Sequence, residues 1–232
     1  MFIFRELHPP LLEQLRLRLA SRDGTSWTAL MDELLCELAE QQPSATPARI
    51  RHALARIPVL DHMLDAARLA AGSPGAVLAI VSDANSVYIE SMLEHHALAG
   101  CVREVVTNPA AFDGPRLRVQ PFHALHLAPH GCTDCPANMC KGRILDRLRG
   151  DHGGGFAHVL YVGDGSGDFC PSTRLGAHDV VFARADDADG KSYGLLKKVR
   201  ASPERVQARV VPWRSGEDIF HHFQAFFQSL DT

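Results

Sequence analysis

From residue 76 onward the chain alternates apolar runs with amphipathic segments, and this alternation constrains the fold more than any other feature. The apolar runs predict β-strands at 76–81, 102–106, 158–162, 179–183 and around 208–211. The amphipathic segments predict helices at about 86–98, 141–149, 191–200 and 216–229. A continuous apolar run such as 76–81 is typical of a strand buried on both faces. Strands that alternate with helices predict an α/β fold with a mostly parallel, doubly wound sheet.

The earlier part of the chain has helical spacing almost throughout. Thr46 and Pro47 stand in the favoured order of an N-cap followed by a first-turn proline. Apolar stripes at this spacing normally pack into a core. We therefore expect a helical cap over residues 8–72 and an α/β core over residues 73–232, with a possible hairpin within the loop-rich segment 108–140.

The composition limits the classes of partner. A formal net charge of −3 over 232 residues gives no electrostatic reason to expect nucleic acid or an anionic membrane surface. No apolar run approaches the roughly 18–20 residues of a membrane span, and the N-terminus does not resemble a signal peptide. We therefore expect a cytoplasmic protein with reduced cysteines and with no nucleic-acid or membrane partner. The oligomeric state does not follow from the sequence.

The run at 158–162 leads into a glycine-rich loop that contains two acids. Asp164 and Asp168 lie four positions apart, directly after the strand. Carboxylates at the carboxyl end of a strand are how open α/β sheets hold a hard cation beside a ligand. The alternative is a solvated Gly-Asp turn that follows an ordinary strand.

Two other positions bear on the chemistry of this loop. Ser82 and Asp83 follow the first strand, where a helix begins and its N-terminus can bind an anion. Lys141 begins a helix, although the helix dipole favours acids there, and this placement indicates an anionic ligand. The alternatives are that Ser82 and Asp83 cap the helix and that Lys141 faces solvent.

Taken in chain order, these residues match what phosphate-monoester hydrolysis needs. Ser82 and Lys141 would bind phosphoryl oxygens, and Asp164 and Asp168 would hold magnesium against the transferring group.

This order resembles the second, third and fourth motifs of the haloacid-dehalogenase superfamily of phosphatases. Several longer strings resemble the small eukaryotic phosphatases that act on phosphoethanolamine, phosphocholine or pyridoxal phosphate. These strings are Val81–Asn85, Pro136–Lys141, Tyr161–Gly165, Asp168–Pro171 and Val211–Trp213. The resemblance runs from about residue 9 to the end of the chain.

The resemblance implies a magnesium-dependent phosphatase for a small phosphorylated metabolite that bears an amine. It assigns phosphate binding to Ser82 and Lys141, and magnesium to Asp164, with Asp168 supporting the metal or positioning Lys141. It also assigns substrate binding to the segment of Asp83 and Asn85, where a carboxylate suits a cationic head group.

One part of the family pattern is missing from the sequence. Members begin with a buried strand that ends Asp-x-Asp-x-Thr, whose first Asp attacks phosphorus and whose second acts as acid and base. Here Asp187 and Asp189 form an Asp-x-Asp only in a polar loop, and laying Met1–Phe4 over the strand puts Arg5 and Leu7 in the two aspartate positions. Without that central strand, two buried strands lack partners. We expect a truncated gene model and an unstable or inactive chain, in which Met1–Phe4 can fill the gap only over a short stretch.

A cysteine cluster has the spacing of a zinc site. The pattern is Cys-x-x-Cys-x4-Cys with histidines just upstream, and it predicts a Cys3His site. The candidate ligands are Cys132, Cys135, Cys140 and His130, with His123 and His126 nearby. The alternative is a set of reduced thiols, and Cys36 and Cys170 are expected to be ordinary buried cysteines.

Two functions of other classes remain open beside the phosphatase. One is a catalytically inactive pseudophosphatase that binds a phosphate ester or a partner. The other is an interaction module organised by zinc, which would lose its fold on chelation.

Overall fold

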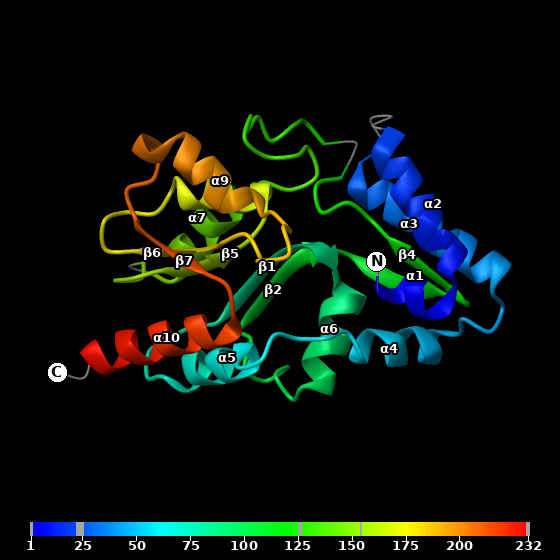
Figure 1. Ribbon diagram of the computed structural model, residues 1–232, viewed down its shortest axis with the longest axis horizontal. Helices are drawn as coiled ribbons and strands as arrows, with labels where there is room; N and C mark the ends of the chain where they lie inside the picture. Colours follow the sequence, from blue (N-terminus) through cyan, green and yellow to red (C-terminus); the bar gives the residue numbers. More distant parts are fainter. Residues whose placement is uncertain (1, 22–25, 125–126, 154, 231–232) are drawn as a thin grey trace. The chain divides into compact units, whose positions relative to one another are not determined.

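A computed structural model describes residues 2–21, 26–124, 127–153 and 155–230. The chain divides into two compact units, and most of their helices and strands are labelled in Figure 1. Unit 1 comprises Met1–Val59 and Val77–Ala128, and unit 2 comprises Leu60–Ala76 and Pro129–Thr232. The predicted boundary between a cap ending at residue 72 and a core starting at residue 73 stays a prediction.

Unit 1 begins with helices and continues with strands. Its helices are α1 (Phe2–Leu7), α2 (Pro9–Ser21), α3 (Trp27–Gln41), α4 (Pro47–Ala55) and α6 (Ser86–His95). Its strands are β1 (Ala79–Asn85), β2 (Glu104–Asn108), β3 (Ala110–Asp113) and β4 (Arg116–Val119). The Thr46 side chain accepts a hydrogen bond from the Arg49 amide, which confirms the predicted start of α4.

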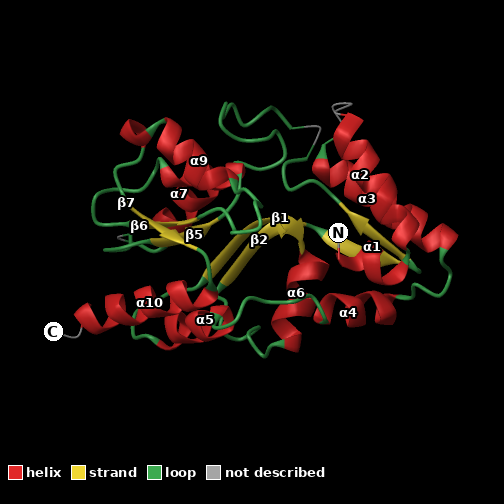
Figure 2. Ribbon diagram, viewed as in Figure 1, coloured by secondary structure: helices red, strands yellow, loops and turns green. Residues whose placement is uncertain are grey.

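The core of unit 1 joins its helices to the β3–β4 hairpin. Leu34, Leu38 and Leu54 are fully buried there, together with Leu117 of β4. The antiparallel pairing of β3 and β4 confirms the hairpin predicted within 108–140. The two hairpin strands and the helices around them appear in Figure 2.

Phe2–Phe4 lie in a helix, so these described residues do not fill the place of the missing strand, even over a short stretch. Residues Phe2–Leu7 form α1, in which Ile3 and Phe4 are buried in the core of unit 1. Helix formation places these two apolar side chains against the other helices of the unit. A short strand would instead need a sheet neighbour.

β1 pairs with β2 in parallel, and it is less buried than its sequence predicts. Residues Ala79–Ala84 are all partly exposed, and Val77 just before the strand is 39% exposed. In the described part of the chain this sheet has two strands, so β1 has a strand neighbour on one side only. The expectation of a strand covered on both faces therefore fails here.

Unit 2 contains a parallel three-stranded sheet in the order β5-β6-β7. The strands are β5 (Leu160–Gly163), β6 (Val180–Arg184) and β7 (Arg209–Trp213). The α-helices are α5 (Met63–Gly72), α7 (Lys141–Asp151), α8 (Phe169–Ser172), α9 (Gly194–Ala201) and α10 (Gly216–Leu230). Two short 3-10 helices, η1 (Ser166–Asp168) and η2 (Pro203–Arg205), complete it.

Helices cover this sheet on both faces. Val181 and Ala183 of β6 pack in one cluster with the buried leucines of α9, whereas Val180 and Phe182 pack in another with residues of α5 and α10. Since successive strand residues point to opposite faces, the two clusters lie on opposite sides of the sheet. The predicted α/β class with parallel strands is confirmed, and the carboxyl end of β5 leads directly into the candidate loop.

None of the helices in the described ranges combines the length and the apolar character that a membrane crossing needs.

Candidate functional site

The loop after β5 is built around the buried carboxylate of Asp168, which is 4% exposed. Its Oδ1 accepts hydrogen bonds from Lys141 Nζ and from the Tyr161 hydroxyl, each at 2.7 Å. Its Oδ2 accepts from the backbone amides of Asp164 and Gly165, at 3.1 and 2.9 Å. One side chain therefore fixes the loop backbone, the end of β5 and the first residue of α7.

The surroundings of Asp168 stabilise its charged form. Burial alone would raise the pKa of this carboxyl, but the Lys141 charge and the hydrogen bonds from Lys141, Tyr161 and Gly165 outweigh burial and lower the pKa. Burial and the adjacent carboxylate raise the pKa of Tyr161 well above its ordinary value. Tyr161 therefore stays protonated and donates its hydrogen to Asp168.

Gly163 makes room for this carboxylate. A Cβ atom at position 163 would lie 2.8 Å from Cβ and 2.9 Å from Cγ of Asp168. Contacts this short do not occur between real side chains, so any larger residue here would push Asp168 out of its place. The buried position of Asp168 therefore requires a glycine at position 163, directly before Asp164.

Lys141 is the first residue of α7, and its side chain is 17% exposed. The ion pair with Asp168 holds the ammonium group beside the loop, so the alternative of a solvent-facing lysine is wrong. An ammonium group carries three N–H donors, and Asp168 accepts one of them. Lys141 thus presents a fixed cation at the N-terminus of an 11-residue helix, where the dipole is also positive.

Asp164 lies exposed at the tip of the same loop. Its backbone carbonyl accepts a hydrogen bond from the Leu195 amide at 3.0 Å, which anchors the residue to α9. Exposed carboxylate oxygens on a fixed backbone suit Mg²⁺, which prefers oxygen ligands and keeps several waters. Asp168 suits the ion less well, because each of its oxygens already accepts two hydrogen bonds.

The carboxyl end of β1 in unit 1 contains an irregularity. Val81 pairs with Val106 and Asn85 pairs with Asn108, so β1 has two more residues than β2 in this interval. Such bulges redirect side chains and are frequent beside functional sites. Ser82 and Asp83 both lie within the bulge.

Hydrogen bonds fix the residues around this bulge. The Asn108 side chain, 1% exposed, donates to the backbone carbonyls of Asp83 and Ala84 at 2.9 and 2.7 Å. The Ser82 hydroxyl accepts from the Ala84 amide at 3.2 Å. Asn85 caps α6 by accepting from the Tyr88 amide at 3.0 Å, so the alternative of Ser82 or Asp83 as the cap is wrong.

The predicted site residues fall in both compact units. Ser82, Asp83 and Asn85 lie in unit 1. The structure brings Lys141, Asp164 and Asp168 together in unit 2. The phosphate, substrate and magnesium roles of all six stay predictions.

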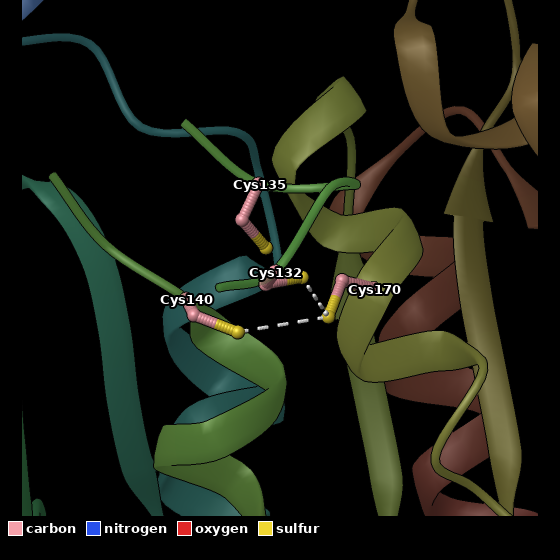
Figure 3. A group of neighbouring side chains, drawn as sticks. All are labelled: Cys132, Cys135, Cys140 and Cys170. Carbon is pink, nitrogen blue, oxygen red and sulfur yellow. Dashed lines mark hydrogen bonds between the residues drawn. The ribbon is translucent and has the colours of Figure 1, made fainter. Parts of the chain in front are cut away.

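The cysteine cluster in unit 2 differs in one member from its prediction. Figure 3 shows Cys132, Cys135 and Cys140 directed toward Cys170, and the four sulfur atoms lie within 4.8 Å of one another. His130 is held by the loop backbone: its Nδ1 accepts from the Cys132 amide at 3.1 Å and its Nε2 lies 2.9 Å from the Pro136 carbonyl oxygen. The interpretation of Cys170 as an ordinary buried cysteine is therefore wrong. His126 lies outside the described residues.

The Asp-x-Asp of the sequence is part of a polar loop, as expected. The Asp187 carboxylate accepts from the Tyr193 hydroxyl at 2.7 Å and lies 3.6 Å from the Arg184 guanidinium. Asp189 is exposed. These contacts stabilise the turn between β6 and α9.

Sequence reasoning missed Asn108, Cys170 and the function of Tyr161. Asn108 and Cys170 act on residues 25 and 38 positions away, and Tyr161 acts on Asp168 seven positions away, a separation that follows no helix or strand period. The available signal was for Tyr161 and Cys170, which both lie in strings that resembled the family, Tyr161–Gly165 and Asp168–Pro171.

Comparison with known proteins gives one consistent family. The sequence profile of the family described as Putative Phosphatase matches residues 8–227. A thiamine phosphate phosphatase-like protein of Arabidopsis thaliana is 39% identical over 83% of this chain and 76% of the relative. Inorganic pyrophosphatase 2 of the same plant is 36% identical over 83% of this chain and 67% of the relative. Human phosphoethanolamine/phosphocholine phosphatase is 36% identical over 65% of this chain and 55% of the relative.

A solved structure resembles the fold. Cytosolic 5′-nucleotidase IIIB bound to cytidine matches with a TM-score of 0.50 at 13% identity, over 97% of this chain and 73% of that chain. At this identity the likeness concerns the fold alone, and it agrees with the predicted α/β class.

Proposed function

The chain belongs to the Putative Phosphatase family, whose fold is of the haloacid-dehalogenase type, and we propose that its ligand is a small phosphate monoester that bears an amine. Phosphoethanolamine, phosphocholine and pyridoxal 5′-phosphate are the candidate esters, as the strings around Ser82, Lys141 and Asp164 imply. The human relative named for phosphoethanolamine and phosphocholine supports this choice. The pyrophosphatase among the relatives makes inorganic pyrophosphate the comparison compound without an amine.

The observation that carries the proposal is the ion pair of Lys141 and Asp168 at the start of α7. A lysine that is largely buried and held at 2.7 Å by a carboxylate has little freedom to lose when it binds an anion. The amides at the helix N-terminus add a second attraction for phosphoryl oxygens. The roles that we propose for Ser82, as a hydroxyl donor to phosphate, and for Asp83 and Asn85, as partners of the cationic end of the ester, rest on the family strings and not on the geometry of unit 2.

Asp164 is the residue that we propose as a magnesium ligand. Bound magnesium supplies a Lewis acid that neutralises charge on the phosphoryl group. Asp168 would support this site indirectly, because its carboxylate orients the Asp164 amide and Lys141 together.

The attacking aspartate of this phosphatase type has no counterpart in residues 1–232, where the only Asp-x-Asp is Asp187 and Asp189. We therefore propose that residues 1–232, used alone, bind the ester without hydrolysing it. This specific observation favours a catalytically inactive, ester-binding form as the second candidate function.

A cytoplasmic location fits the six free thiols.

The test compares binding and hydrolysis in the same preparation. Purified residues 1–232 are titrated by calorimetry with the three amine-bearing esters and with pyrophosphate, with and without magnesium, and released phosphate is measured in parallel. We expect magnesium-dependent binding of at least one amine-bearing ester, weakened about tenfold or more in Lys141→Met, without phosphate release. Lys197→Met, an exposed lysine of α9, is the matched control and should bind as the unaltered chain does.

Each result decides a separate part of the proposal. Phosphate release that Asp164→Asn abolishes would overturn the inactive form and establish turnover by this chain. Failure to bind any of the amine-bearing esters would overturn the proposed ligand class. Equal affinity for pyrophosphate and for the amine-bearing esters would remove the role of Asp83 in recognising the amine.

A further inference from the structure

The cysteine cluster contains four potential ligands of one metal ion, and three of them come from a segment without regular structure. We propose that Cys132, Cys135, Cys140 and Cys170 bind one zinc ion as a tetrahedral tetrathiolate site, and that this zinc joins the segment before Lys141 to the turn after Asp168. The site is separate from the magnesium proposed at Asp164. It rests on the geometry of unit 2 and does not depend on the identity of the phosphate ester.

Two of the sulfur–sulfur distances match those around a shared metal ion. Sγ of Cys170 lies 3.6 Å from Sγ of Cys132 and 3.8 Å from Sγ of Cys140. Four sulfurs at about 2.3 Å from a central zinc form a tetrahedron with edges of about 3.8 Å. A disulfide would need about 2.05 Å between two sulfurs, and it would join the four thiols only in pairs. The distances therefore favour one central ion over two disulfides.

The burial of the ligands also suits a structural zinc site. Cys140 and Cys170 are buried, whereas Cys132 and Cys135 are partly exposed, which gives the ion a path of entry. The Cys132-x-x-Cys135 spacing is the short ligand pair typical of such sites. The contacts of His130 keep this turn in shape from outside the sulfur cluster.

The ligands come from two segments that are far apart in the sequence. Cys132, Cys135 and Cys140 precede α7, in a stretch from residue 127 to 140 that has no helix or strand. Cys170 belongs to α8, a single turn directly after η1. A long irregular segment can bury little apolar surface of its own, so a metal that ties it to a helix supplies stability that the backbone lacks.

The arrangement couples the cluster to Lys141 and Asp168. Cys140 is the N-cap residue of α7, next to Lys141, and its side chain makes no capping hydrogen bond. Cys170 follows Asp168 by two residues. A zinc ion bound to both cysteines would therefore fix the backbone on each side of the ion pair. Lys141 and Asp168 would then keep their 2.7 Å contact without having to order the segment themselves.

The surroundings of the cluster have the charge and space that a tetrathiolate site needs. Zinc with four thiolates carries two negative charges, and the N-terminus of α7 and Arg174 beside Cys170 both offset them. Gly142 permits the close approach of α7, because a Cβ at this position would lie 2.6 Å from Sγ of Cys170. Gly142→Ala should therefore displace Cys170 and weaken zinc binding.

The first experiment measures metal in the unaltered full chain. Protein purified under reducing conditions is analysed for zinc, and then reconstituted with cobalt(II) to record its absorption spectrum. We expect about one zinc ion per chain, together with the visible bands and thiolate charge-transfer bands of tetrahedral cobalt. Absence of both zinc and cobalt binding in the reduced chain would overturn the proposal. A count of fewer than six free thiols in the freshly purified chain, with no metal, would point to disulfides and would also overturn it.

The second experiment assigns the ligands and the coupling. Cys170→Ser and Cys135→Ser should lose most of the bound zinc, whereas Cys36→Ser and Cys101→Ser, which alter free cysteines of unit 1, should keep it. Zinc retained in Cys170→Ser would overturn the four-cysteine site. If Cys170→Ser does not fold, hydrogen exchange on the unaltered chain, with and without a chelator, tests whether zinc joins the two segments. Chelation should increase exchange in 132–145 and 163–172 and leave β6 protected, whereas unchanged exchange in both segments would overturn the coupling.

Discussion

Lys141 Nζ and Oδ1 of Asp168 lie 2.7 Å apart, across 27 positions of sequence, and a cysteine of the four-sulfur cluster stands close beside each residue in the chain. This relationship ties together the two chemical features of unit 2. The ion pair positions a cation for an anionic ligand, and the cluster lies where the two chain segments that carry the pair meet. The ion pair and the sulfur cluster are thus built on the same two chain segments. Neither sequence motif by itself reveals that these segments meet.

Asp168→Asn should destabilise unit 2 strongly. The substitution removes the negative charge that pairs with Lys141, and it gives the four donors around the carboxylate a partner that can no longer accept all of them. Removing one partner of a buried ion pair typically costs about 3–5 kcal/mol. Urea unfolding at neutral pH measures the loss.

The control for this variant is Asp151→Asn at the end of α7. Asp151 is exposed and pairs with Arg147 one turn away, at 3.0 Å. Such surface pairs contribute about 0.3–0.5 kcal/mol. This variant should therefore have nearly the same free energy of unfolding as the unaltered chain. Equal stability of the two variants would contradict the buried role of Asp168.

Gly163→Ala should also destabilise the loop, because the new Cβ would lie 2.8 Å from Cβ of Asp168. Asp168 is held by four hydrogen bonds and cannot retreat, so we expect a loss of about 1–3 kcal/mol in the free energy of unfolding. Gly167→Ala in the same loop is the control, since nothing lies within 4 Å of a Cβ there. A Gly163→Ala chain as stable as Gly167→Ala would show that the loop shifts freely.

The sequence predicted those elements whose pattern is local. The alternation after residue 75 indicated each strand of the parallel sheets, and the cap-then-proline order at Thr46 located a helix start, because periodicity and capping depend on near neighbours. The partial exposure of β1 was not predictable, since burial depends on which strands become neighbours. Cys170 was missed for the same reason: the contact with Cys132 spans 38 positions, and no spacing rule covers that separation.

Asn108→Ala should destabilise the end of β1. The variant leaves the carbonyls of Asp83 and Ala84 without the amide that bonds to both, and the Phe122 amide loses its acceptor, Oδ1 of Asn108, at 3.0 Å. Asp83 and Ala84 are partly exposed and Phe122 is exposed, so water can replace part of the lost bonding, and we expect a loss of about 2 kcal/mol in thermal or urea unfolding.

Thr107→Val provides the matched control, because Thr107 precedes Asn108 on β2. Thr107 is buried, and within the described ranges its hydroxyl has no hydrogen-bond partner. Replacing this hydroxyl by a methyl group of similar size should leave stability unchanged or raise it slightly. A large loss in both variants would indicate general sensitivity of β2 and no specific role of Asn108.

The stability of unit 1 should depend on pH through Asp32 of α3. Its carboxylate accepts from Arg118 at 3.0 and 2.9 Å and from the Val119 amide at 2.7 Å. Burial opposes ionisation, but these bonds outweigh it and lower the pKa below its ordinary value. Because the folded pKa is below the unfolded one, the contribution is present above about pH 4 and is lost as the pH falls through the folded pKa.

Asp32→Asn should therefore lose less stability than the unaltered chain when the pH is lowered from about 6 to about 3. Urea unfolding at the two pH values measures this difference. Glu13→Gln is the control, because Glu13 is exposed and pairs with Arg16 on its own helix. An equal acid response in Asp32→Asn and in the unaltered chain would contradict the role of Asp32.

Asp164→Asn should weaken magnesium binding while the fold stays intact. The Asp164 carboxylate is exposed at the loop tip, and its backbone contacts, to Asp168 and Leu195, do not involve the side chain. Unfolding without magnesium should therefore change by no more than about 0.5 kcal/mol. Because an amide replaces a charged oxygen ligand, magnesium affinity measured by calorimetry should fall about tenfold or more.

Asp189→Asn, which changes an exposed acid of the loop after β6, should bind magnesium as the unaltered chain does. Unaltered affinity in Asp164→Asn would place the ion elsewhere, and the exposed tip of the β5 loop would then serve only as a turn.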